Sequence, residues 1–144
     1  MSSFNYEEVY KKFQNFVQLN INPNNTHKAT ININVKAFNK KDFKGTEKEM
    51  IDLVTQFGII LKENNAKYKN LGTVVINLKN VSHDNFSLSY FKKIYKVLDE
   101  KFYKEDIVDK IICFCSNSIP IVVWKLIKPI IDPMTAKKFI FYKI

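Results

Sequence analysis

The stretch VVWKLIKPIIDPMTAKKFIFYKI, from Val122 to Ile144, decides how the chain is organised, because it places a helix directly before a strand. Residues 119–131 favour a helix, in which Pro120 suits the first turn and Pro129 kinks or ends it. The run KKFIFYKI then predicts a last strand. The stretch is both apolar and rich in lysine, an unusual combination for an exposed segment, and it needs a functional explanation.

Upstream of this stretch, two apolar runs predict buried strands. They are KIICFC (110–115) and GTVVINL (72–78), and such continuous runs are typical of strands covered on both faces. A helix between them begins at Ser87. Its inward residues are expected to be Leu88, Phe91, Ile94, Leu98 and Phe102.

Earlier in the chain, Thr46 and Glu49 form a capping-box pattern that opens a helix running to about Asn65. Its inner stripe is expected to be Met50, Val54, Phe57 and Leu61. Before it, KATININVKAF (28–38) alternates apolar residues with asparagines and predicts a half-buried strand. The N-terminal segment, residues 1–20, is expected to be helical, with an amphipathic pattern over 3–19.

Helices and strands therefore alternate along the whole chain, which predicts the α/β class. Strands separated by helices pair in parallel through crossover connections, so we expect a mostly parallel sheet with helices on its faces. The length of 144 residues favours a single domain over 1–144.

The amino-acid composition limits the classes of function that the chain can have. The net charge is +9 and all 23 basic residues are lysine, spread evenly along the chain. Without arginine or a basic block, nucleic-acid binding is not favoured. No apolar run is long enough to span a bilayer, and the N-terminal residues lack the apolar core of a signal peptide. The sequence therefore predicts a cytoplasmic protein.

Residues that carry catalytic chemistry are sparse. The three glycines form no phosphate-binding loop, and His27 and His83 lack a partnered nucleophile. Cys113 and Cys115 lie in an apolar strand and are expected to be buried thiols rather than a metal or redox site. We therefore expect neither an enzyme nor a bound metal or cofactor.

Three stretches resemble the CRAL-TRIO lipid-binding family, to which the yeast phosphatidylinositol-transfer protein belongs. The sequence WKLIKPIIDPMTAKKF (124–139) is similar to the family's gate segment, an aromatic and a basic residue followed by roughly L-F-K-P-F-L-D-P-V-T. GTVVINLKNVS is similar to its strand and D-L-K-G turn, and FYKEDIVDKIICFCSN to its Y-P-E-R segment and following strand. The chain resembles a short member of the family.

The resemblance implies a CRAL-TRIO-like fold in which a C-terminal gate helix, residues 117–136, closes an apolar pocket. The gate and pocket residues would be Trp124, Lys128, Ile130, Ile131 and Asp132. Glu105, Thr135 and Lys138 match the residues that bind a phosphoinositide headgroup in some members. Lysine can hold phosphate, threonine can donate a hydrogen bond, and glutamate can accept from inositol hydroxyls. Without the resemblance, Glu105 would be an ordinary surface acid, Thr135 a turn residue and Lys138 a solvated lysine.

The implied function is binding or transfer of a phospholipid, most readily a phosphoinositide, by a protein that is peripheral at membranes and attracted to anionic lipid through its lysines. Departures from the pattern matter. The Y-P-E-R segment is Y-K-E-D here (103–106), and Gly72 and Val74 replace hydroxyl residues that serve choline lipids. The alternative is a protein-interaction or scaffold module without a lipid pocket, which contacts a small GTPase or a second copy of itself as a homodimer.

Overall fold

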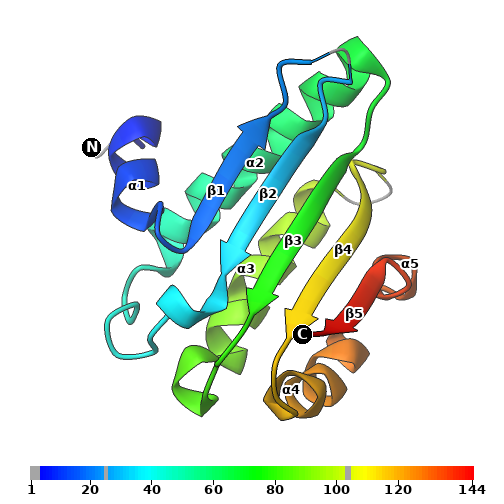
Figure 1. Ribbon diagram of the computed structural model, residues 1–144. Helices are drawn as coiled ribbons and strands as arrows, with labels where there is room; N and C mark the ends of the chain where they lie inside the picture. Colours follow the sequence, from blue (N-terminus) through cyan, green and yellow to red (C-terminus); the bar gives the residue numbers. More distant parts are fainter. Residues whose placement is uncertain (1–3, 25, 103–104) are drawn as a thin grey trace.

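Five strands lie side by side in sequence order, β1 to β5, and helices pack along them (Figure 1). The computed structural model describes residues 4–24, 26–102 and 105–144. The strands are β1 (Val17–Ile21), β2 (Ala29–Asn34), β3 (Gly72–Leu78), β4 (Val108–Cys115) and β5 (Phe139–Lys143). The helices are α1 (Tyr6–Phe13), α2 (Glu47–Tyr68), α3 (Leu88–Lys101), α4 (Ile119–Ile127) and α5 (Pro133–Ala136).

The predicted α/β class is confirmed. Strands β2 to β5 pair in parallel, and only β1 runs antiparallel to its neighbour. Parallel neighbours need crossover connections, and α2, α3 and α4 each supply one. Ser87 accepts a hydrogen bond from the Tyr90 amide at 3.2 Å, so the predicted start of α3 is also confirmed.

The N-terminal helix is shorter than predicted. It ends at Phe13, a turn follows, and Val17–Ile21 forms strand β1 instead of helix. Val17, Leu19 and Ile21 alternate with Gln18 and Asn20, which is a strand period. The prediction was wrong because the apolar residues up to Val17 also fit a helical stripe, and five alternating residues were too few to outweigh it.

The helices cover one face of the sheet. Ile33, Ile76, Cys113 and Phe141 lie in one register row on the helix side. Their neighbours Val75, Ile112 and Ile140 form the next row and point to the opposite face, where they remain half-buried or exposed. We call this opposite side the open face. The prediction that β3 and β4 are covered on both faces was therefore wrong for the residues that the structure describes.

Two local predictions also need correction. The capping box before α2 does not form, because the Thr46 hydroxyl bonds the Phe43 carbonyl at 2.6 Å and the Tyr90 hydroxyl at 2.9 Å. Glu49 instead pairs with Lys12 of α1 at 2.8 Å. Leu88, expected to point inward, is exposed, and Tyr90 is the buried residue of α3.

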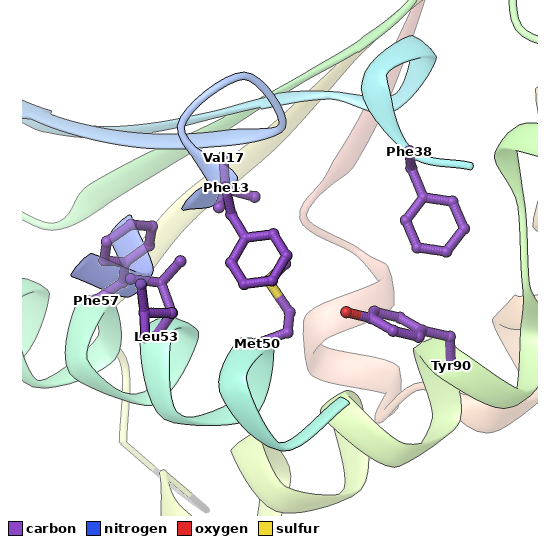
Figure 2. Close-up of a cluster of buried hydrophobic side chains, with 8 residues drawn as sticks. Phe13, Val17, Phe38, Met50, Leu53, Phe57 and Tyr90 are labelled. Carbon is purple, nitrogen blue, oxygen red and sulfur yellow. The ribbon is translucent and has the colours of Figure 1, made fainter. Parts of the chain in front are cut away.

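The main core lies where α1 and α2 meet β1 and β2. Phe13 and Val17 pack there with Met50, Leu53 and Phe57 of α2, which are 0–1% exposed (Figure 2). Phe38 and Tyr90 extend the cluster toward α3, with ring centroids 5.1 Å apart. A smaller cluster, formed by Leu78, Val81, Cys113 and Cys115, lies under the C-terminal part of the chain.

Candidate functional site

The segment that the sequence singled out, residues 117–136, folds as three short pieces. Helix α4 gives way to a 3-10 turn over Lys128–Ile130, as Pro129 predicts, and α5 follows. The Asp132 carboxylate accepts hydrogen bonds from the amides of Met134 and Thr135 and so caps α5. The chain then enters β5 directly. We refer to residues 117–136 as the gate segment.

The inner side of the gate segment rests on β5. The Trp124 ring lies 4.5 Å from Phe139 and 5.3 Å from Phe141, measured between centroids. Phe141 is the register partner of Cys113, so the tryptophan covers that part of the sheet. Ile131 is buried, and Ile130 is half-buried beside it. The inner contacts are therefore aromatic and apolar.

The outer side of the gate segment is apolar as well. Ile121, Val122 and Leu126 are 41–59% exposed and lie on one face of α4, together with Lys125. Met134 in α5 is 66% exposed. A helix at a water-facing surface normally carries polar residues on that side. Helix α4 is apolar on both sides, and Lys125 is the one charged residue within it.

A hydrogen bond to Tyr95 ties the gate segment to α3. The Asp132 amide donates to the Tyr95 hydroxyl at 2.8 Å. Burial raises the pKa of Tyr95, so the hydroxyl remains protonated and available as an acceptor and donor at neutral pH. This contact holds the turn between α4 and α5, while Lys128 in the same turn is exposed.

The three residues expected at a headgroup site lie in two places. Lys138, one residue before β5, bonds the Asp106 carboxylate and the Val108 carbonyl, each at 2.6 Å. Thr135 lies one turn earlier in α5. Glu105 adjoins Asp106 in the chain but pairs with Lys62 of α2 at 2.9 Å. Lys138 and Glu105 therefore each form an ion pair with a different residue of the protein.

Sequence reasoning missed both of these partners. Lys62 lies 43 residues before Glu105, and only the packing of α2 beside α3 brings it near. Asp106 was visible as a departure from the family pattern, because an acid stands where the family has arginine. Glu105 and Lys62, with Lys101 and Phe102, line a groove of about 360 Å³ at the far end of α2.

The two thiols are buried, as expected. Burial raises the pKa of Cys113 to about 12, and the neighbouring Cys115 adds to the shift. The thiol is therefore protonated and unreactive at neutral pH. Within residues 4–24, 26–102 and 105–144, no group of three metal-binding side chains gathers.

The open face carries a second groove of about 530 Å³, at the carboxyl ends of β2 and β3. Amide side chains dominate its lining, among them Asn32, Asn34 and Asn77, with Phe114 at one side. None of the helices in the described part of the chain is long and apolar enough to cross a membrane.

One comparison with known proteins shows the family, and another shows the fold. The family model for the CRAL/TRIO domain matches residues 13–144. A solved structure titled "Crystal structure of Sfh5" aligns with a TM-score of 0.66 at 20% identity, over 91% of this chain and 50% of that chain. The chain thus spans half the length of the Sfh5 chain, and the likeness shows a shared fold. No curated protein sequence shows significant similarity to the chain.

Proposed function

Because the chain belongs to the CRAL/TRIO domain family, a family of lipid-binding domains, we propose that it binds or transfers a phospholipid. The proposed lipid class is the phosphoinositides. The proposed site is an apolar space between the gate segment and the helix side of β4 and β5. The headgroup would lie at Lys138, Thr135 and Glu105.

The observation that carries this proposal is the two-sided apolar surface of α4. If the gate segment moves away from β5, lipid tails replace the contacts of Trp124 with Phe139 and Phe141, and apolar area stays out of water. The outer residues Ile121 and Leu126 would then insert among the lipid tails at the membrane surface instead of facing water. A helix that serves only as a lid over a permanent core would not expose them.

The headgroup end has the chemistry to hold a phosphate. Lys138 already has an anionic partner in Asp106, at 2.6 Å, and a lipid phosphate would take the place of that carboxylate. The Thr135 hydroxyl would donate a hydrogen bond to the same group. Release of Glu105 from Lys62 would leave the glutamate free to accept hydrogen bonds from inositol hydroxyls.

Charge supports attachment to an anionic membrane. Lys125, Lys128 and Lys137 are exposed on the gate segment and just after it. Each lysine near an anionic lipid surface contributes about 1 kcal/mol of attraction. The expected location is therefore cytoplasmic and peripheral at membranes, and the ligand is the phospholipid itself, without a cofactor or enzymatic step.

One observation favours the alternative of a protein-interaction module. Trp124 packs directly on β5, so side chains fill the space beneath α4 in this conformation. If the segment never opens, its exposed apolar face would serve a protein partner instead of a membrane. The test must therefore measure lipid binding directly.

The experiment compares binding to vesicles of phosphatidylcholine with and without phosphoinositide. We expect phosphoinositide-dependent binding, and Lys138→Ala is expected to weaken it by about tenfold, the loss of one charge-assisted hydrogen bond. Lys11→Ala is the matched control, because it removes the same charge from an exposed position of α1, at the opposite edge of the sheet from the gate segment, and should change binding little. Equal binding by both variants would remove Lys138 from the site, and no binding by the unmodified protein would favour the alternative.

A further inference from the structure

The two edge strands of the sheet, β1 and β5, differ in whether their outward backbone groups have hydrogen-bond partners. At the β1 edge, the Tyr10 hydroxyl accepts a hydrogen bond from the Leu19 amide at 2.8 Å and lies 3.3 Å from the Leu19 carbonyl. Helix α1 thereby satisfies backbone groups of the edge strand. The β5 edge has no such cover among the described residues, and Figure 1 shows β5 on the outside of the sheet with its outer side free.

The free backbone groups of β5 can be identified. The Lys138 carbonyl accepts from Ile111, and the Ile144 amide donates to Cys115, both in β4. Even-numbered residues therefore direct their backbone groups inward. The alternation of a strand then directs the N–H and C=O groups of Phe139, Phe141 and Lys143 outward. This edge offers three donors and three acceptors in a row.

The side chains of β5 do not prevent another strand from pairing with it. Exposed edge strands are usually blunted by charges, prolines or bulges. The sequence FIFYK has one charge and no proline, and its register with β4 runs without a bulge. On the open face Ile140 and Tyr142 are 38% and 49% exposed.

We propose that β5 pairs with β5 of a second copy of this chain, antiparallel across a two-fold axis at Phe141. Phe141 then faces its own copy, and Phe139 faces Lys143 of the other copy. All of these are outward-directed residues, so each pair exchanges two hydrogen bonds and none of the free groups is left over. The two sheets join into one of ten strands.

This register also suits the charges. Each Lys143 lies opposite a phenylalanine, with which a cation–π contact can form, and the two lysines are far from one another. On the open face Ile140 of one copy lies opposite Tyr142 of the other, and both lose water contact. A second copy of the chain is therefore complementary to this edge in hydrogen bonds, charge and apolar surface.

The test is the mass in solution, measured by light scattering across a wide concentration series. We expect a dimer of twice 16.9 kDa that dissociates on dilution. The double variant Ile140→Lys/Tyr142→Lys brings lysines opposite one another and should raise the dissociation constant about tenfold or more. Both side chains are exposed, so folding should be retained, as checked by circular dichroism.

Two further variants identify the edge and the register. Ile140→Lys/Tyr142→Glu sets opposite charges against one another in this register only and should restore the dimer. Gln18→Lys/Asn20→Lys adds the same charge to exposed positions of β1 and should leave the dimer unchanged. A monomer at all concentrations would overturn the proposal. So would a dimer that the β5 lysines leave intact, or one that the β1 lysines disrupt as strongly.

Discussion

The two ends of the helix layer differ in how their apolar residues are used. Over β1 and β2, the core-facing residues Phe13, Met50 and Leu53 of α1 and α2 are only 0–5% exposed. Over β4 and β5, a similarly apolar segment leaves Leu126 59% exposed. Apolar area removed from water stabilises a fold, whereas apolar area left in water does not. The first region therefore holds the fold together, and the second is available for a ligand or a surface.

The difference predicts unequal local stability. Regions with few fully buried contacts open at lower free energy than the core. The gate segment has Pro120 and Ile131 as its buried residues and is hydrogen-bonded to α3 through Tyr95. We therefore expect the gate segment to separate from β5 at a lower free energy than α2 leaves the core, as the proposed lipid exchange would require.

The largest expected effect is at the centre of the N-terminal core. Phe57 is 1% exposed, and its ring centroid lies 5.5 Å from that of Tyr10. Phe57→Ala should lower the free energy of unfolding by about 3–5 kcal/mol, because it leaves a cavity in a closely packed site. Denaturant titration measures the loss, and a loss below about 1.5 kcal/mol would contradict the assignment of this cluster as the main core.

Trp124→Ala is the corresponding change in the gate segment. Because Trp124 is half-buried, we expect a smaller loss of about 2 kcal/mol in the same titration, although tryptophan is the larger side chain. The comparison between the two variants is more informative than either value. A loss for Trp124→Ala as large as that for Phe57→Ala would mean that α4 is an ordinary part of the core.

These two regions were not equally predictable from sequence. The stripe of α2 and strand β2 follow from periodicity, β3 and β4 from their continuous apolar runs, and the gate segment from its family pattern. β1 was missed because Phe16 and Val17 extend a helical stripe, and the open face was missed because a run such as GTVVINL looks the same whether one or both faces are covered. Lys62 and Asp106 could not be predicted as partners, since ion pairs across the fold leave no local pattern.

A third prediction concerns opening of the gate segment, measured by the labelling of a buried thiol. Cys113 is 2% exposed and lies beside Phe141, whose ring Trp124 contacts. Burial raises its pKa to about 12, which keeps the thiol unreactive in this conformation. Vesicles that contain anionic phospholipid should accelerate thiol labelling by about tenfold, by favouring the open form. Mass spectrometry of the labelled protein measures the rate.

The matched control for labelling places the thiol in the other region. In a variant with Cys113 and Cys115 changed to serine, Val9→Cys supplies a buried thiol in the N-terminal core. Vesicles should leave its labelling rate unchanged. If both thiols respond equally, the membrane loosens the whole protein, and a separate motion of the gate segment is excluded.

The smallest effect concerns a contact that links the two regions. Burial opposes ionisation of Asp109, but hydrogen bonds from Lys28 and Thr73 outweigh it and lower the pKa of the carboxyl. A lowered folded-state pKa contributes stability above the unfolded value of 3.8, which is lost as the pH falls through the folded pKa. Because the pair is partly exposed, Asp109→Asn should cost about 1 kcal/mol or less at neutral pH. The difference from the unmodified protein should shrink in acid, and thermal unfolding against pH measures it; a constant difference would contradict the assigned pKa.

The most direct test of the account is native mass spectrometry of the purified protein, followed by extraction and identification of lipids. The account predicts a phospholipid bound in a one-to-one ratio to the chain, which is lost or exchanged when anionic vesicles are added. A protein that carries no lipid, and that takes up none from phosphoinositide vesicles, would contradict it. In that case the exposed face of α4 would have to be explained by a protein partner.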